Sequence, residues 1–510
     1  MSMPKKNSNT YKVCILASSN LLLQILGFVY RMMLTDLAGT EALGLQSLVM
    51  QVYSIAVSIC ISGMNVAVTT MAAGLANREP GSIRRLAINS FRIYLGLFFL
   101  MAIPIFSFRN AIAARMIGDA SSARSLILIL VCIFMTGIEN LLKSIHHGVG
   151  RVRPTAVSEL MEQSARFILV FLLLSKRGGG ANSETVFLII LGMVFSEFVS
   201  VGLLFASYMR KFGREKPAVI PSLTHDLTGI LVPAAFTGLA STIFASAASL
   251  LLPNRLMLAG YTRGMALSML GMLNSVAVPL VMLPMAFVGA VGTVSLPAVS
   301  AAAFEGNRDR LRILIGKSMY AALSAACCIN FAFLPFLQQL SYLLFGMVPR
   351  MEIFILLSIK AAIIYFQIVS TAVLNGLKRQ RLVLIYAVIG EVTQLILIYV
   401  LSAISSLHIY GYLISMSIGE FIRLMLSFSE IKRVLRIWPL SASDSMLPTA
   451  IGAILYLYSK YAVGSSKLID AQPLLTAAHV AAICLLGMVC AFLMRTIKTE
   501  LHRCRYSSKL

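Results

Sequence analysis

The chain has 510 residues, of which 58% are hydrophobic and 12% are charged, and its formal net charge at pH 7 is +23. A water-soluble protein of this size needs more polar residues to cover its surface, so the composition excludes a soluble globular class and favours a protein in a lipid bilayer. The basic residues lie scattered over short loops rather than on one face, which is typical of membrane proteins and excludes nucleic acid as a partner.

Apolar segments of about 20 residues, the length that spans a bilayer, recur along the whole chain. The first follows the sequence MSMPKKNSNTYK, and we interpret it as an uncleaved helix because no convincing small-residue cleavage site follows a short apolar core. The predicted spans are 13–34, 43–63, 86–107, 125–146, 155–175, 185–208, 228–252, 265–288, 311–336, 352–374, 381–402, 409–430, 446–463 and 475–495. The sequence therefore predicts an all-α polytopic membrane protein of about fourteen transmembrane helices.

The distribution of basic residues predicts the orientation of these spans. If the N-terminus is cytoplasmic, the inside segments carry 28 Lys and Arg residues and the outside loops carry 10. Because cytoplasmic loops hold the excess of basic residues, both termini are predicted to be cytoplasmic, which requires an even number of helices. We expect a monomer in the cytoplasmic (inner) membrane.

Two similar blocks follow one another along the chain. Ser196-Glu197-Phe198-Val199 in the sixth span matches Gly419-Glu420-Phe421-Ile422 in the twelfth, and Glu162 in the fifth span matches Glu391 in the eleventh. Blocks of six helices have the same orientation, so they predict a parallel repeat of two lobes around a central cleft, which is typical of transporters. The predicted divisions are an N-lobe at 1–227, a C-lobe at 228–436, and two further helices with a basic cytoplasmic tail at 437–510.

Several charged residues lie inside the predicted spans, where each needs a partner or a water-filled cavity. Glu162 and Arg166 are four residues apart and share one helix face. One interpretation is an ion or proton site. The other, which we favour, is a structural pair whose loss in Glu162→Gln would lower the folded yield. The residues assigned to this structural class are Glu159, Glu162, Arg166, Glu197, Lys360, Glu391, Glu420 and Arg423.

Arg31 differs from these residues because its nearest acids in the sequence, Asp36 and Glu41, lie at the water interface. In a two-lobe transporter the first and seventh helices border the cleft, where a guanidinium fork could hold phosphate oxygens. The alternative is that Arg31 and the arginines near the seventh span extend to lipid headgroups. The candidate substrate-binding residues are Arg31, Gln24, Asn20, Gln46, Gln51, Arg255, Arg263 and Asn274.

Signals of catalysis are lacking in the sequence. The His146-His147 pair has no third metal ligand nearby, the eight cysteines show no metal-type spacing, and no Walker motif occurs. We therefore predict no catalytic residue, no metal and no cofactor.

Three stretches carry a resemblance to a known family. They are Gly148-Val-Gly-Arg-Val-Arg-Pro-Thr-Ala-Val-Ser-Glu-Leu-Met-Glu-Gln-Ser-Ala-Arg166, Leu283-Pro284 with Gly289-Ala-Val-Gly-Thr-Val-Ser-Leu-Pro-Ala-Val-Ser300, and Gly27-Phe-Val-Tyr-Arg31 with Glu41-Ala-Leu-Gly-Leu45. These stretches resemble the stage V sporulation protein B family of the multidrug/oligosaccharidyl-lipid/polysaccharide exporter superfamily, and they follow one another along the chain in the same order as in that family. The resemblance implies two six-helix lobes plus two helices, alternating access, and a lipid-linked oligosaccharide cargo.

The related lipid II flippases place several Arg residues on the first, second and eighth helices. Arg31 keeps one basic residue on the first helix, whereas Gln24 stands where another Arg would be expected. The second and eighth helices lack the family's Arg. The resemblance is therefore specific to the family and not to lipid II as the substrate.

The favoured hypothesis is a flippase that moves a polyprenyl-pyrophosphate-linked saccharide or peptidoglycan precursor for cell-wall, spore-cortex or surface polysaccharide synthesis. Its partners would be that lipid, the bilayer, and a monovalent ion or the membrane potential. One alternative is an ion-coupled multidrug antiporter of the same fold, which should present unpaired acids in its cleft. Another is a membrane glycosyltransferase or polymerase, which usually has a large external loop that this chain lacks.

Overall fold

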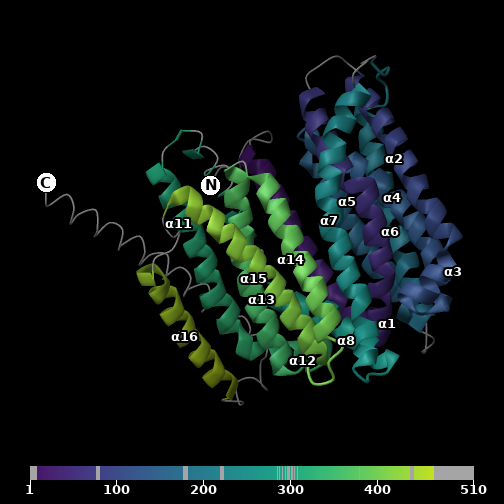
Figure 1. Ribbon diagram of the computed structural model, residues 1–510. Helices are drawn as coiled ribbons and strands as arrows, with labels where there is room; N and C mark the ends of the chain where they lie inside the picture. Colours follow the sequence, from purple (N-terminus) through teal and green to yellow (C-terminus); the bar gives the residue numbers. More distant parts are fainter. Residues whose placement is uncertain are drawn as a thin grey trace, which may run out of the picture. The chain divides into compact units, whose positions relative to one another are not determined.

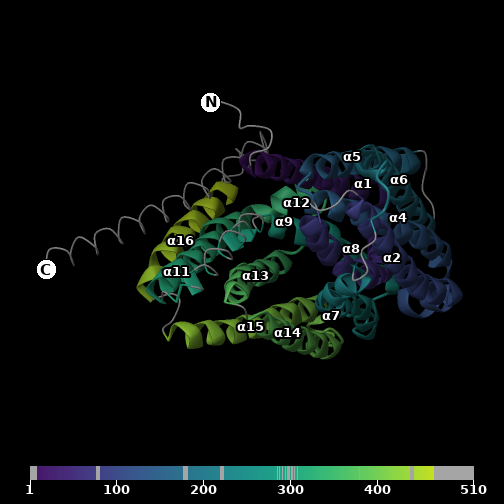
Figure 2. The same ribbon diagram turned by 90° about the horizontal axis from the view of Figure 1, so that it is seen from above.

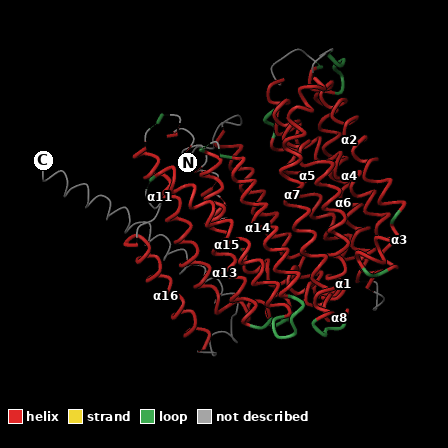
Figure 3. Tube along the Cα trace, in the orientation of Figure 1, coloured by secondary structure: helices red, strands yellow, loops and turns green. Residues whose placement is uncertain are grey.

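The computed structural model describes residues 9–75, 81–175, 182–218, 223–283, 308–377, 379–436 and 442–464, together with scattered positions between 285 and 306. In these ranges the regular structure is helical, and no strand occurs (Figure 3). The chain divides into two compact units, one formed by Met1–Asn254 with Thr262–Gly271 and the other by Arg255–Tyr261 with Met272–Leu510. The predicted lobe boundaries at 227 and 436 remain a prediction of the sequence repeat.

The first unit is a bundle of long helices (Figures 1 and 2). Its members pack through α1, which contacts α2, α4, α5 and α6. The elements of this unit, of which α7 continues into the second, are α1 (Asn9–Leu75), α2 (Ser82–Ser107), α3 (Arg109–Ala111), η1 (Ile112–Ile117), η2 (Ala120–Ser122), α4 (Ala123–Gly148), α5 (Val152–Ser175), α6 (Asn182–Phe212), α7 (Leu223–Leu258) and α8 (Arg263–Met272).

A glycine replaces the loop that was expected between the first two spans. Gly39 has φ 75° and ψ 162°, a conformation outside the helical region, and the helical segments before and after it make up α1. Glycine adopts positive φ without a Cβ clash, so one residue is enough to break the helix. The predicted gap at 35–42 is therefore much shorter in the structure.

The core of the first unit joins α1, α2, α4, α6 and α7 through buried apolar side chains that include Cys60, Leu86, Leu204 and Leu231. Tyr94 is fully buried among them, and its hydroxyl donates to the Ile133 carbonyl at 2.8 Å. That bond satisfies the one polar group of a large side chain inside the bundle. The cysteines whose side chains the structure describes are buried and free, so they pack as small apolar residues: Cys60, Cys132, Cys327 and Cys328.

The second unit contains the remaining described helices. Within it, α13 packs against α11 and α15, α14 packs against α15, and α16 packs against η4. The Asn330 side chain on η4 donates to the Ser358 carbonyl on α13 at 2.7 Å. The elements are η3 (Leu273–Ala277), α9 (Val278–Met282), α11 (Arg308–Ala325), η4 (Ala326–Phe331), η5 (Leu334–Phe336), α12 (Leu337–Phe345), α13 (Met351–Gly376), α14 (Gln380–Leu401), α15 (His408–Leu435) and α16 (Ala442–Gly464).

Nine helical stretches among the described residues are long and apolar enough to cross a membrane. One of them, Leu22–Ala72, has 51 residues and includes part of the first predicted span and all of the second, because α1 joins two helical segments across the kink at Gly39. Twelve of the first thirteen predicted spans fall on described helices, and the eighth, 265–288, does so as far as Met282, after which some of its residues lie outside the described set. The fourteenth, 475–495, lies outside the described residues. The protein is an all-α, multi-pass membrane protein, as the composition predicts.

Close helix packing at Gly44 gives a stability prediction. A Cβ at Gly44 would overlap the Leu267 backbone carbonyl on α8, whereas a Cβ at Gly27 on the same α1 would meet nothing within 4 Å. We expect Gly44→Ala to destabilise the protein by about 1–3 kcal/mol, the usual cost of overpacking. Gly27→Ala, the matched control, should be neutral or stabilising because alanine favours helix. Thermal unfolding of the purified variants measures both, and equal unfolding temperatures would contradict this helix contact.

Candidate functional site

Arg31 and Gln24 lie on the same face of the first half of α1, and both side chains are exposed. The Thr35 hydroxyl donates to the Arg31 backbone carbonyl at 2.9 Å, and this bond does not involve the Arg31 guanidinium. Within the described ranges, no carboxylate forms an ion pair with Arg31. An arginine without a counter-charge is costly at membrane depth unless water or an anion reaches it.

The other predicted cargo contacts are spread over two units. Gln46 and Gln51 lie half-buried on the part of α1 that follows Gly39. Asn20 lies on α1, but its side chain is outside the described set. Asn274 lies on η3 in the second unit, where its side chain is half-buried and has an interaction partner. Their role in binding cargo remains a prediction.

Arg263 contacts the loop at one end of the first unit. Its Nη2 donates to the Ile117 carbonyl at 2.6 Å, and a Cβ at Gly118 would overlap this guanidinium. The neighbouring Asp119 lies outside the predicted spans, where burial raises its pKa but hydrogen bonds from Ser121 and Ser122, with the Arg263 charge, lower it below its usual value overall. Arg263 therefore helps to order the turn between η1 and η2.

Arg255 also has a partner within its own unit. Its guanidinium carbon lies 3.2 Å from the centroid of the Tyr399 ring on α14, a cation–π contact. Arg255 and Arg263 thus have contacts inside the protein, and Arg31 is the candidate whose charge is available to a ligand in the described part of the chain.

An ion-pair network joins α4, α5 and α6 inside the first unit. The pair predicted from helical spacing, Glu162 with Arg166, is confirmed. Arg166 also lies 3.7 Å from Glu197 on α6, and its Nε donates to the Ser196 hydroxyl at 3.1 Å. Arg166 is therefore held by two carboxylates and a hydroxyl from two helices.

Lys143 on α4 is a second cation of the network that the sequence analysis missed. Its Nζ lies 2.8 Å from Glu139, 3.2 Å from Glu159 and 3.9 Å from Glu162. In the charge bias Lys143 counts as one of the 28 basic residues on the cytoplasmic side, and Glu139 carries no prediction. The four-residue spacing of Glu139 and Lys143 within a predicted span is the signal that could have identified them.

The network holds more acid than base. The carboxylates of Glu139, Glu162 and Glu197 lie within 4.8 Å of one another, and all three residues are buried. With Glu159, four carboxylates share two cations, Lys143 and Arg166. Glu197 is 3% exposed, and its Oε2 has no hydrogen-bond partner in the described structure. Crowded buried carboxylates need protons or a cation between them, so this cluster can take up either.

The charges in the second unit are balanced by comparison. Arg423 lies 3.7 Å from Glu420 on α15, and the Lys360 ammonium donates to the Met416 sulfur at 3.3 Å. Together with Glu391 on α14, this set has two acids and two bases. The acids recur between the repeats, as the sequence showed, but the excess of negative charge occurs in the first unit.

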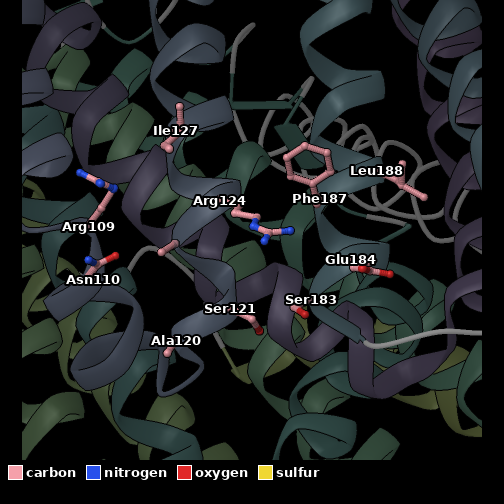
Figure 4. A pocket seen from close by; sticks show the side chains of 11 residues that line it. Arg109, Asn110, Ala120, Ser121, Arg124, Ile127, Ser183, Glu184, Phe187 and Leu188 are labelled. Carbon is pink, nitrogen blue, oxygen red and sulfur yellow. The ribbon is translucent and has the colours of Figure 1, made fainter.

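A cavity of about 1020 Å³ opens at one end of the first unit, between α3, η2, α4 and α6. Arg124 points toward Ser183 and Glu184 across it (Figure 4). Arg109, also on its wall, already donates to the Phe106 carbonyl at 2.9 Å and stacks on the Phe106 ring. Acidic and basic groups therefore line the cavity together, which gives it no clear preference for one ligand charge.

Comparisons with known proteins agree with this architecture. The chain is 22% identical over 449 residues to stage V sporulation protein B of Bacillus subtilis (strain 168), covering 83% of each chain. It is 24% identical over 336 residues to the lipid II flippase MurJ of the same organism, covering 60% of this chain and 59% of that protein.

Solved structures show the same fold. An inward-closed lipid II flippase MurJ matches with a TM-score of 0.68 at 12% identity, covering 95% of this chain and 99% of that chain. An inward-facing multidrug resistance MATE family transporter of the MOP superfamily also matches with a TM-score of 0.68, at 16% identity and covering 83% and 98%. The family model described as polysaccharide biosynthesis protein matches residues 10–303, more than half of the chain. The protein therefore belongs to the polysaccharide biosynthesis protein family.

Proposed function

We propose that this protein is a flippase that moves a polyprenyl-pyrophosphate-linked saccharide across the cytoplasmic membrane by alternating access, and that it performs no covalent chemistry. The family is one of polysaccharide biosynthesis, and its relatives include a lipid II flippase. Such a cargo has an anionic headgroup that must cross the bilayer core, where it needs a protein cation to accompany it.

The observation that carries this proposal is the state of Arg31. Its guanidinium is exposed on a membrane helix, has no carboxylate partner among the described residues, and shares a face with the exposed amide of Gln24. A guanidinium binds two phosphate oxygens at once, and an amide can bind a neighbouring hydroxyl or phosphate oxygen. This pair suits a pyrophosphate joined to a sugar.

We further propose that a proton or a monovalent cation drives the transport by binding at Glu139, Glu162 and Glu197. The three buried carboxylates lie within 4.8 Å of one another, and two bases serve four acids in the network. Binding of a cation would change the charge balance between α4, α5 and α6, the helices that the network joins. We propose this coupling role in place of the purely structural role that helical spacing alone suggested.

The same acid excess is the observation that favours the second candidate, a multidrug antiporter. In that case the carboxylates would exchange an organic cation for a proton or Na⁺. Arg31 argues against this, because an exposed cation on α1 repels a cationic cargo.

A reconstitution experiment separates the two candidates. Proteoliposomes with a fluorescent polyprenyl-pyrophosphate disaccharide in both leaflets are treated with dithionite, which bleaches the outer leaflet alone. We expect the protein to extend bleaching to nearly all of the lipid, whereas ethidium should not be transported. Ethidium transport with no lipid movement would support the antiporter and contradict the flippase.

Orientation gives a separate prediction. In a background without reactive native cysteines, an impermeant thiol reagent should label Ser183→Cys and Ser466→Cys in intact cells. Cysteines at exposed positions in the loops near Ser82 and Ser222 should react only after permeabilisation, because the positive-inside bias assigns these loops to the cytoplasm. Labelling of Ser222→Cys in intact cells would overturn the fourteen-helix topology.

A further inference from the structure

A second cavity, of about 380 Å³, lies where α5 begins and α6 ends. The two helices pack side by side, and both lie in the first unit (Figures 1 and 2). This is the end of the bundle that the charge bias assigns to the cytoplasm. The residues that line the cavity are Arg151, Leu203, Ala206, Ser207, Arg210 and Lys211.

The three charged residues on its wall are all cations. In the described ranges, none of Arg151, Arg210 and Lys211 forms an ion pair with a carboxylate. The Nη1 of Arg151 is buried and has no hydrogen-bond partner there either. Cations around one cavity repel each other, and a buried donor without a partner costs free energy, so an anion would relieve both.

The Ser207 hydroxyl, which lines the cavity, already has a hydrogen-bond partner, the imidazole of His146. His146 Nδ1 lies 2.8 Å from the Leu142 carbonyl, which can only accept, so Nδ1 carries the proton and Nε2 accepts from the Ser207 hydroxyl at 3.1 Å. Recognition of an anion therefore falls to the three cations. Arg210 and Lys211 also lie in the last turn of α6, where cations stabilise the helix by complementing its dipole. The helix dipole does not account for Arg151, which lies outside α6.

An apolar stripe leads from membrane depth to this cavity. Phe195, Val199 and Leu203 are 52%, 37% and 41% exposed and follow one another at four-residue spacing along α6. Arg210, seven residues after Leu203, continues the same face. Because α6 is apolar enough to span a bilayer, acyl chains surround this stripe.

We propose that the cavity binds the phosphate headgroup of an anionic membrane phospholipid, with an acyl chain along the stripe of Phe195, Val199 and Leu203. The Arg151 guanidinium and the charges of Arg210 and Lys211 contact the phosphate oxygens, while Leu203 and Ala206 contact the glycerol region. Anionic lipids of the cytoplasmic leaflet are attracted to such basic positions. The site depends on the membrane setting and not on the proposed cargo, because phospholipid surrounds α6 whatever the protein transports.

Lipid binding to the purified full-length protein in neutral detergent tests the proposal. The probes are dioleoyl phosphatidylglycerol and dioleoyl phosphatidylcholine, titrated separately and quantified by native mass spectrometry. We expect the wild type to bind phosphatidylglycerol at least about tenfold more tightly, and Arg210→Gln/Lys211→Gln to lose that preference. The control Arg214→Gln/Lys216→Gln removes the same charge from exposed positions just beyond α6 and should retain it.

Each other outcome overturns the proposal. Equal loss in both double variants would mean a diffuse basic surface, and equal binding of the two lipids would mean no anion selectivity. Complete displacement of phosphatidylglycerol by free pyrophosphate would assign the cavity to a soluble anion, and preferential displacement by undecaprenyl pyrophosphate would assign it to the cargo. If Arg210→Gln/Lys211→Gln fails to fold, Arg151→Gln removes the unpaired buried donor and should abolish the same preference.

Discussion

Arg31→Ala is expected to abolish complementation of a flippase-deficient strain while its level in the membrane stays near that of the wild type. The guanidinium is exposed and forms no ion pair with a described carboxylate, so its removal breaks no ion pair in the described part of the chain. The loss would fall on the cargo, whose phosphates lose a bidentate partner. Arg31→Lys should be partly active, because an ammonium keeps the charge but not the fork of donors.

The matched control is Arg92→Ala. Arg92 is also an exposed arginine on a membrane helix, and it lies in the half of α2 that is predicted to be nearer the cytoplasm, where its long side chain can extend toward lipid headgroups. Its loss should have a milder effect on growth. Complementation assays with quantitative blots of the membrane fraction measure both variants. Full activity of Arg31→Ala would remove the phosphate-contact role and leave Arg31 as a headgroup anchor.

Glu162→Gln is expected to leave the protein folded but to remove the dependence of transport on the driving cation. The sequence suggested the opposite, a loss of folded protein from an unpaired Arg166. The structure changes this expectation, because Arg166 keeps Glu197 and Ser196, and Lys143 keeps Glu139 and Glu159. The substitution removes one negative charge from a network in which four carboxylates share two cations.

Arg166→Gln is the informative contrast. It leaves the four carboxylates with Lys143 alone, and breaking a buried ion pair costs about 3–5 kcal/mol, so the folded yield should fall steeply. Fluorescence-detected size-exclusion chromatography measures the yield, and flipping in proteoliposomes with imposed proton or Na⁺ gradients measures the coupling. If Glu162→Gln loses as much folded protein as Arg166→Gln, the cluster is structural and the coupling proposal is wrong.

Residue spacing along single helices predicted part of the candidate site. The spacing of Glu162 and Arg166 predicted their ion pair, because residues four apart share a helix face. It could not predict that Glu197 approaches Arg166, or that Lys143 bridges three carboxylates, because these contacts join different helices. Conversely, the sequence placed Arg255 and Arg263 with Arg31 among the candidate cargo contacts, and their partners Tyr399 and Ile117 come from distant segments.

The sequence by itself determined the membrane class and the helical architecture. Lipid offers the backbone no hydrogen bonds, so a long apolar segment has to form a helix that satisfies its own polar groups, whatever its neighbours are. The tertiary structure decided which acidic and basic side chains form ion pairs with one another. Whether a carboxylate in a membrane helix is neutralised depends on which side chains the packed helices bring within a few ångströms, and packing alone produced the excess of acid at Glu139, Glu162 and Glu197.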